Sequence, residues 1–209
     1  MKAFIWDLDG TLLDSYEVIV GGLFAMCRKI EYPISKNAIH RFVIISSVKE
    51  FMDKVFKETG IDPDELERIY SGSYIPNLAQ IRAIPEAKEA LETLKKKDAV
   101  HFVFTHRGKS SEPVLKRLGL HEFFSEFVTG DMGFPRKPEP DAIFYLMKKY
   151  GLKPEDTYYV GDRTIDMDCA KNAGVRGVLY LPEGSYCKPN GSETYIVQDL
   201  RECAGILEG

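Results

Sequence analysis

Residues 3–11 read AFIWDLDGT and place two acidic residues directly after a run of four apolar ones. A short continuous apolar run is typical of a strand buried on both faces, so residues 3–6 are predicted to form a strand of a parallel sheet. Asp7 and Asp9 then stand at the carboxyl end of that strand, where open α/β sheets bind ligands. Because the two residues are two positions apart in an extended segment, their side chains project to the same side.

The rest of the chain after residue 85 alternates between helix and strand patterns. Apolar runs predict strands at residues 100–105 (VHFVFT), 126–131 (EFVTGD), 157–162 (TYYVGD) and 176–181 (RGVLYL). Helices are predicted over residues 86–97, 111–118, 139–150 and 166–173, and a short strand and closing helix over residues 195–207. This alternation is typical of a parallel sheet with helices on both faces and right-handed crossovers. We therefore expect an α/β fold with a Rossmann-like, doubly wound parallel sheet.

A helical segment interrupts this alternation after the first strand. Residues 15–83 contain four stretches with helical periodicity and little strand signal. This pattern predicts an all-helical subdomain inserted into the sheet domain. We expect residues 1–16 and 81–209 to form the Rossmann-like core and residues 17–80 to form the insertion.

The composition limits the class of protein. The 209 residues are 44% hydrophobic and 29% charged, which is ordinary for a soluble globular protein, and the net charge of −4 argues against general binding to nucleic acid or anionic lipid. The four cysteines have no CxxC spacing, which argues against a structural zinc site. We expect a cytoplasmic protein without a membrane partner, because no apolar run has the length of a signal peptide core or a membrane span.

Polar side chains follow several of the predicted strands. Thr105 and Asp162 come directly after strands, and Asp166 follows four residues later. Strand ends meet at one edge of an open parallel sheet, so these segments are expected to converge on one site. Carboxylates held together repel one another, and Mg²⁺ relieves that repulsion through oxygen ligands while keeping places for water and a substrate phosphate. The Thr105 hydroxyl and the Lys137 ammonium group suit phosphoryl oxygens.

Four motifs together resemble those of a known family. DLDGT at residues 7–11, Thr105 after an apolar strand, Lys137 within RKPEPD and GDRTID at residues 161–166 resemble, in order, the motifs of the haloacid dehalogenase superfamily. The helical insertion between the first two motifs is similar to the cap of the phosphoglycolate phosphatase and β-phosphoglucomutase-like branch. Each motif alone is short, but four in order cover nearly the whole chain and are specific together.

The resemblance implies catalytic and metal-binding roles. Asp7 would attack phosphorus and form an aspartyl-phosphate, while Asp9 would protonate the leaving oxygen and later take a proton from water. The implied Mg²⁺ ligands are the carboxylates of Asp7 and Asp162 and the backbone carbonyl of Asp9. Asp166 would be a further ligand or would orient one through water. The implied activity is Mg²⁺-dependent hydrolysis of a small phosphorylated metabolite by a monomer or homodimer.

The resemblance also implies a phosphate-binding set. Thr105 and Lys137 would hold the phosphoryl oxygens, and backbone amides near Gly10 and Arg107 would add donors. His106 stands where close relatives usually have Asn, and Arg163 stands where many have Ser. An imidazole and a guanidinium near the phosphate would favour an anionic substrate. Alternatively, both side chains point to solvent or pair with local acids.

Two other functions stay open at this point. A sugar-phosphate mutase needs the same core residues as a phosphatase, and the helical insertion shows no motif that separates the two. A non-catalytic binding protein is a further alternative, because a fold alone does not imply a function. Asp9 together with Asp162 argues against haloacid dehalogenation and phosphonate hydrolysis, which the family carries out with altered residue sets.

Overall fold

A computed structural model describes residues 1–208 and divides the chain into two compact units. We call them the core unit, Met1–Asp14 together with the chain from Arg82 onward, and the helical unit, Ser15–Ile81. Where the chain leaves and re-enters the core unit, β2 (Leu13–Asp14) pairs antiparallel with β3 (Arg82–Ala83). This ribbon was absent from the prediction, because two residues are too few to give a periodic pattern.

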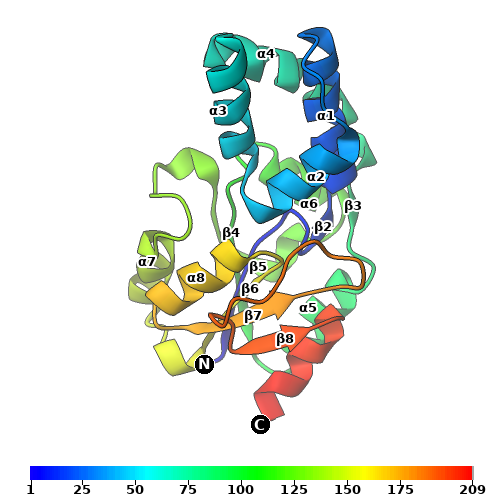
Figure 1. Ribbon diagram of the computed structural model, residues 1–209. Coiled ribbons are helices and arrows are strands. Elements are labelled where there is room, and N and C mark those ends of the chain that lie inside the picture. Colours follow the sequence, from blue (N-terminus) through cyan, green and yellow to red (C-terminus); the bar gives the residue numbers. More distant parts are fainter. Residues whose placement is uncertain (209) are drawn as a thin grey trace. The chain divides into compact units, whose positions relative to one another are not determined.

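The core unit is built on a six-stranded parallel sheet (Figure 1). The strands lie in the order β5 (Phe124–Val128), β4 (Val100–Phe104), β1 (Ala3–Trp6), β6 (Thr157–Gly161), β7 (Arg176–Tyr180) and β8 (Tyr195–Val197). The chain runs from β1 outward to β5 and then returns to β6 on the other side of β1. Ligands bind at such switch points in open α/β sheets, outside the carboxyl ends of the strands.

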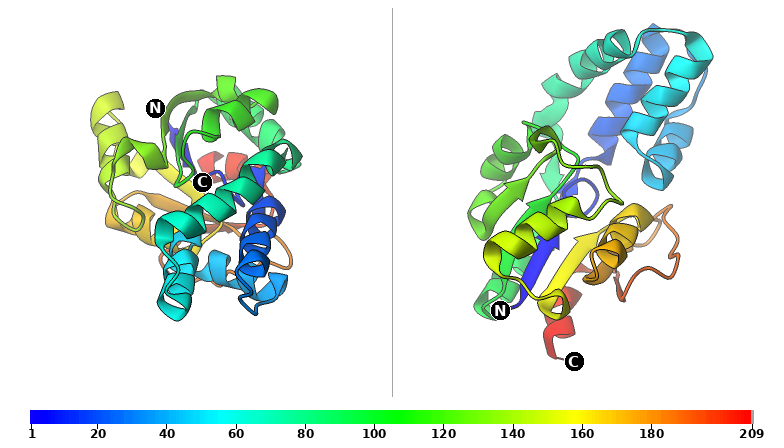
Figure 2. Two further views of the ribbon diagram at one scale, coloured as in Figure 1. Left: turned by 90° about the horizontal axis from the view of Figure 1, so that it is seen from above. Right: turned by 90° about the vertical axis from the view of Figure 1, so that its left-hand side faces the viewer.

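Helices cover both faces of this sheet, as Figure 2 shows for the core unit. They are α5 (Ala87–Lys96), α6 (Ser111–Arg117), α7 (Asp141–Tyr150) and α8 (Thr164–Asn172), with short 3₁₀ helices η2 (His121–Phe123), η3 (Gly130–Met132), η4 (Pro154–Asp156) and η5 (Leu200–Glu208). The predicted closing helix is thus a 3₁₀ helix. The α/β fold with a doubly wound parallel sheet is confirmed.

The central strand β1 is buried on both faces, as its continuous apolar run predicts. Ile5 belongs to a hydrophobic cluster that includes Leu146 of α7 and Ala170 of α8. Its neighbour Phe4 points to the opposite face by the alternation of a strand and stacks on Tyr158, with ring centroids 4.8 Å apart. All four residues of β1 are fully buried, so their packing fixes the position of Asp7, which follows the strand at the edge of the sheet.

The helical unit has a hydrophobic core of its own. It consists of α1 (Tyr16–Lys29), α2 (Lys36–Ile45), α3 (Val48–Thr59), α4 (Pro63–Tyr74) and the 3₁₀ helix η1 (Ile75–Gln80). Leu23, Phe51 and Leu66 are fully buried in one cluster within this unit. The Ser47 hydroxyl accepts the Glu50 N–H at 3.0 Å and so caps the start of α3. Among the described residues, no helix combines the length and apolar character needed to cross a membrane.

Candidate active site

Asp7 occupies the first position after β1, and its side chain is only 2% exposed. Its main-chain N–H donates to the Val160 carbonyl of β6 at 2.9 Å, which fixes the residue beside the neighbouring strand. Oδ1 lies 2.8 Å from the Lys137 ammonium. Oδ2 is buried and has no hydrogen-bond partner within residues 1–208. Burial raises the pKa of Asp7 while Lys137 opposes that rise, so this carboxylate is poorly compensated and suits a further cation.

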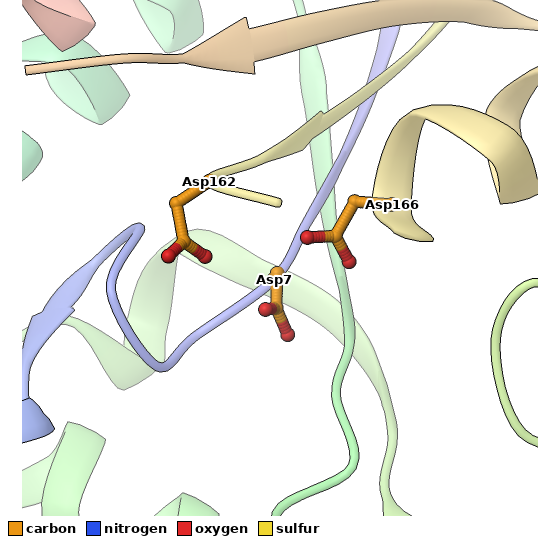
Figure 3. Close-up of side chains that lie close together, drawn as sticks. All are labelled: Asp7, Asp162 and Asp166. Atoms are coloured by element: carbon orange, nitrogen blue, oxygen red, sulfur yellow. The ribbon is translucent and has the colours of Figure 1, made fainter. Parts of the chain in front are cut away.

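Three carboxylates gather at this point of the sheet edge, as Figure 3 shows. Asp7 follows β1, Asp162 follows β6, and Asp166 reaches across from the first turn of α8. One oxygen of each lies within 4.8 Å of the other two, and all three residues are buried. The Thr11 hydroxyl donates to Asp162 Oδ1 at 3.3 Å. An all-oxygen donor set with an under-compensated buried oxygen fits a hard divalent cation, so this cluster can hold a metal ion.

Lys137 provides a fully buried positive charge at the three-carboxylate cluster. Its side chain has no exposed surface, and its Nζ lies 2.8 Å from Asp7 Oδ1 and 2.8 Å from Asp166 Oδ1. The rings of Phe104 and Tyr159 flank the ammonium, with their centroids 5.1 and 5.2 Å away. Burial alone would lower the pKa of Lys137, but Asp166 and Asp7 outweigh burial and hold that pKa above its ordinary value. The lysine is therefore a fixed cation between two carboxylates.

Asp166 is held from three directions. The Tyr159 hydroxyl lies 3.2 Å from Oδ1, and the main-chain N–H of Arg163 donates to Oδ2 at 3.2 Å. Burial by itself would raise the pKa of Asp166, but the Lys137 charge outweighs it and lowers that pKa. Gly161 makes this packing possible, because a Cβ at that position would lie 2.4 Å from the Cβ of Asp166.

Asp9 is held separately from the three-carboxylate cluster. The Arg107 guanidinium binds it through Nε, 3.1 Å from Oδ1 and 3.3 Å from Oδ2, and through Nη2, which also donates to Oδ1. The Arg107 side chain is 2% exposed and that of Asp9 is 22% exposed. A carboxylate held by two guanidinium nitrogens has a fixed orientation at the edge of the site.

Two main-chain amides expected at the phosphate already donate within the loops. Gly10 N–H donates to the Leu13 carbonyl at 2.8 Å, in a turn that needs the positive φ of 84° at Gly10. Arg107 N–H donates to the Thr105 hydroxyl oxygen at 3.1 Å. Because that hydroxyl accepts from Arg107, its own hydrogen remains able to donate to another group.

His106 and Arg163 differ in their surroundings. Arg163 is 11% exposed, and its guanidinium lies 3.9 Å from Asp7 Oδ2 and 4.0 Å from Asp166 Oδ2. The His106 ring has Nε2 3.0 Å from the main-chain nitrogen of Lys137 and Nδ1 3.0 Å from Arg136 Nη2. Burial, reinforced by the nearby cations, lowers the pKa of His106 to about 2. The imidazole is therefore neutral at ordinary pH.

Comparison with known proteins identifies the family of this chain. The family model for haloacid dehalogenase-like hydrolases matches residues 4–180. The chain belongs to this family. A phosphoglycolate phosphatase of Haemophilus influenzae is 30% identical, and the match covers 99% of this chain and 98% of the relative.

Solved structures of the family agree with this assignment. A protein described as a predicted phosphoglycolate phosphatase from Haemophilus somnus superposes with a TM-score of 0.84 at 28% identity, covering 99% of this chain and 98% of the other. A haloacid dehalogenase superfamily hydrolase of subfamily IA from Geobacter sulfurreducens gives a TM-score of 0.76 at 26% identity, covering 99% and 96%. The predicted family is confirmed, and the chain is a haloacid dehalogenase-like hydrolase.

Sequence reasoning missed several groups that surround the site of this hydrolase. Thr11 lies within DLDGT, where the sequence gives it no role of its own, yet it contacts Asp162. The sequence predicts only a buried strand around Tyr159, and for Arg107 it predicts a role of the backbone amide. A tyrosine within a fully buried strand was the available signal, since a buried hydroxyl needs a partner. The direction of the Arg107 side chain had no sequence signal.

Proposed function

We propose that this hydrolase is a Mg²⁺-dependent phosphatase that cleaves a small phosphate monoester through an aspartyl-phosphate on Asp7. The observation that carries the proposal is the state of Asp7: a buried carboxylate with Oδ1 bound to Lys137 at 2.8 Å and Oδ2 without a hydrogen-bond partner among the described residues. The phosphoglycolate phosphatases among its relatives support a phosphate ester as the substrate class. The chain is accordingly a phosphoric monoester hydrolase.

The proposed reaction has two displacements at phosphorus. In the first, an Asp7 carboxylate oxygen bonds to phosphorus, the bond to the leaving-group oxygen breaks, and Asp9 donates its proton to that oxygen. In the second, Asp9 takes a proton from water as the water oxygen bonds to the same phosphorus. The bond between Asp7 and phosphorus breaks, so that inorganic phosphate leaves and Asp7 is regenerated.

The cation site follows from the three-carboxylate cluster. Asp7 and Asp162, with the backbone carbonyl of Asp9, would hold Mg²⁺, and Asp166 would ligate it or orient a ligand. The bound ion would neutralise the negative charge that accumulates on the transferring phosphoryl group. The fit rests on the all-oxygen donors within 4.8 Å of one another and on Asp7 Oδ2, which has no hydrogen-bond partner among the described residues.

The remaining side chains orient the phosphate. The Lys137 ammonium and the free hydrogen of the Thr105 hydroxyl would hold phosphoryl oxygens, with the amides near Gly10 and Arg107 as further candidates. Arg107 holds Asp9 in place through its guanidinium. We propose that the helical unit acts as a cap that selects the substrate and excludes water.

The test is phosphate release from a panel of small phosphate esters, with and without Mg²⁺, for the wild type, Asp7→Asn and Asp141→Asn. Asp141 is an exposed residue of α7, so its variant controls for the loss of one carboxylate. We expect Mg²⁺-dependent release that Asp7→Asn abolishes and Asp141→Asn retains. Acid quenching with a radiolabelled ester should leave label on the wild type and none on Asp7→Asn. Absence of release from every ester would favour the mutase or the binding protein instead.

A further inference from the structure

We propose that His106 is a positioning residue: its imidazole Nε2 accepts the main-chain N–H of Lys137 and so sets where the Lys137 ammonium stands between Asp7 and Asp166. This inference rests on the proposed function, in which Lys137 holds the phosphoryl group. It assigns His106 a contact with the protein main chain instead of the contact near the phosphate that the sequence left open.

The first support is the place of Lys137 in the fold. Lys137 lies in the irregular segment between η3 and α7, where no strand or helix bonds its N–H. The acceptor is His106, 31 residues earlier in the chain, at 3.0 Å. Another side-chain anchor of this segment is Asn172, whose amide donates to the Pro138 carbonyl at 3.0 Å. His106 therefore holds the segment at Lys137 itself.

The second support is the precision that the ammonium needs. Lys137 Nζ lies 2.8 Å from both Asp7 Oδ1 and Asp166 Oδ1, and none of these three side chains is more than 2% exposed. A long side chain carries any displacement of its main chain to its charged end. Displacements of about 1 Å in a site can cost roughly 100-fold in rate, so an anchor on the Lys137 main chain bears directly on catalysis.

The third support is the ionisation of the ring. A main-chain N–H can only donate, so Nε2 must be unprotonated and the single hydrogen of the neutral ring must lie on Nδ1. Burial and the charges of Lys137, Arg136 and Arg163 lower the pKa of His106 to about 2, which keeps Nε2 an acceptor at ordinary pH. Arg136 Nη2, 3.0 Å from Nδ1, is also a donor, so that contact does not hold the ring.

Three variants separate this role from a general packing role. The amide of His106→Gln reaches the position of Nε2 and can accept from Lys137, whereas that of His106→Asn ends near Nδ1 and falls short. His121→Gln makes the same chemical change at a histidine outside the site, whose side chain is 22% exposed and lies beside Glu112 and Glu122. We expect kcat for phosphate release to fall about 10- to 100-fold in His106→Asn, and to stay near the wild-type value in His106→Gln and His121→Gln.

Two measurements by nuclear magnetic resonance test the contact without turnover. Amide hydrogen exchange at Lys137 should speed up in His106→Asn and remain slow in His106→Gln. In the wild type, the nitrogen shifts of His106 should report a neutral ring with its hydrogen on Nδ1. These readings apply even if the wild type releases no phosphate, so failure of the proposed function is distinguishable from failure of this inference.

Three outcomes would overturn the inference. They are wild-type kcat in His106→Asn, equal impairment of His106→Gln and His106→Asn in folded protein, and a His106 ring that carries its hydrogen on Nε2. Melting temperatures of all variants check folding. If His106→Asn does not fold, the inference is tested by the tautomer of the wild-type His106 ring and by kcat of His106→Gln.

Discussion

Replacing Lys137 by Met should destabilise the protein strongly, because the change leaves two buried carboxylates without their shared cation. Lys137 Nζ contacts Asp7 Oδ1 and Asp166 Oδ1, both at 2.8 Å, and the three side chains are at most 2% exposed. Met keeps most of the apolar stem and its packing between the Phe104 and Tyr159 rings. The perturbation is therefore mainly electrostatic.

The size of the effect follows from the burial of the pair. Removing one partner of a buried ion pair costs roughly 3–5 kcal/mol, since the remaining charge stays in a poorly solvating environment. For a chain of this size each kcal/mol lowers the melting temperature by about 2–4 °C, which gives a fall of roughly 6–20 °C. Neutralising one carboxylate with Asp7→Asn in the same chain should recover part of the loss.

The assay is thermal melting in the presence of a chelator, so that no metal ion compensates the carboxylates. Lys49→Met is the matched control, because Lys49 Nζ lies 2.8 Å from Asp53 Oδ2 in a pair whose side chains are 60% and 46% exposed. Surface pairs of this kind contribute little, so we expect almost no shift in that variant. Equal shifts in Lys137→Met and Lys49→Met would show that burial does not give the Lys137 pair its importance.

Arg107→Met should lower kcat for phosphate release about 10- to 100-fold, because it frees the Asp9 carboxylate. Arg107→Lys should recover only part of the rate, because an ammonium group lacks the paired nitrogens of a guanidinium. An unchanged kcat in Arg107→Met would contradict this. Gly161→Ala should lower the melting temperature because its Cβ would lie 2.4 Å from that of Asp166, whereas Gly177→Ala meets the flexible Met167 sulfur at 3.0 Å and should be tolerated. Equal melting temperatures in these two variants would oppose the argument. Burial lowers the pKa of His101 to about 4 and that of His106 to about 2, against 6.5 for an ordinary histidine. Below pH 6.5 these histidines therefore bind protons in the unfolded chain but not in the folded chain. The contribution of each neutral ring to the free energy of unfolding is complete above pH 6.5 and decreases by about 2 kcal/mol between pH 7 and pH 5. Over this interval the melting temperature of His106→Gln should therefore fall less than that of the wild type. Equal pH dependence of the two melting temperatures would count against the prediction.

Much of the fold was predictable because it depends on patterns that persist in a linear chain. The apolar run before Asp7 predicted a strand buried on both faces, and β1 is that strand. The alternation of strands and helices predicted the parallel sheet and thereby the edge where polar residues gather. The ribbon of β2 and β3 has no such pattern, since its strands have two residues each.

The side-chain partnerships of the site were less predictable. Strand ends indicated where Asp7, Asp162 and Thr105 would lie, but a position gives no side-chain direction. Asp9 and Arg107 are 98 residues apart, and only the folded chain shows that they pair. The sequence left His106 either beside the phosphate or turned to solvent, whereas its ring contacts the main chain of Lys137. Such contacts depend on loop conformations that periodicity does not describe.

The three consecutive residues that follow β4 each hold a different part of the site. The Thr105 hydroxyl accepts a hydrogen bond from the Arg107 main-chain N–H, and the His106 ring accepts one from the Lys137 main-chain N–H. The Arg107 side chain donates hydrogen bonds to Asp9. Adjacent residues that act on one site have non-additive effects, so the effect of changing one depends on the identity of the others. Directed evolution of a new substrate preference would therefore need to randomise this tripeptide as one block.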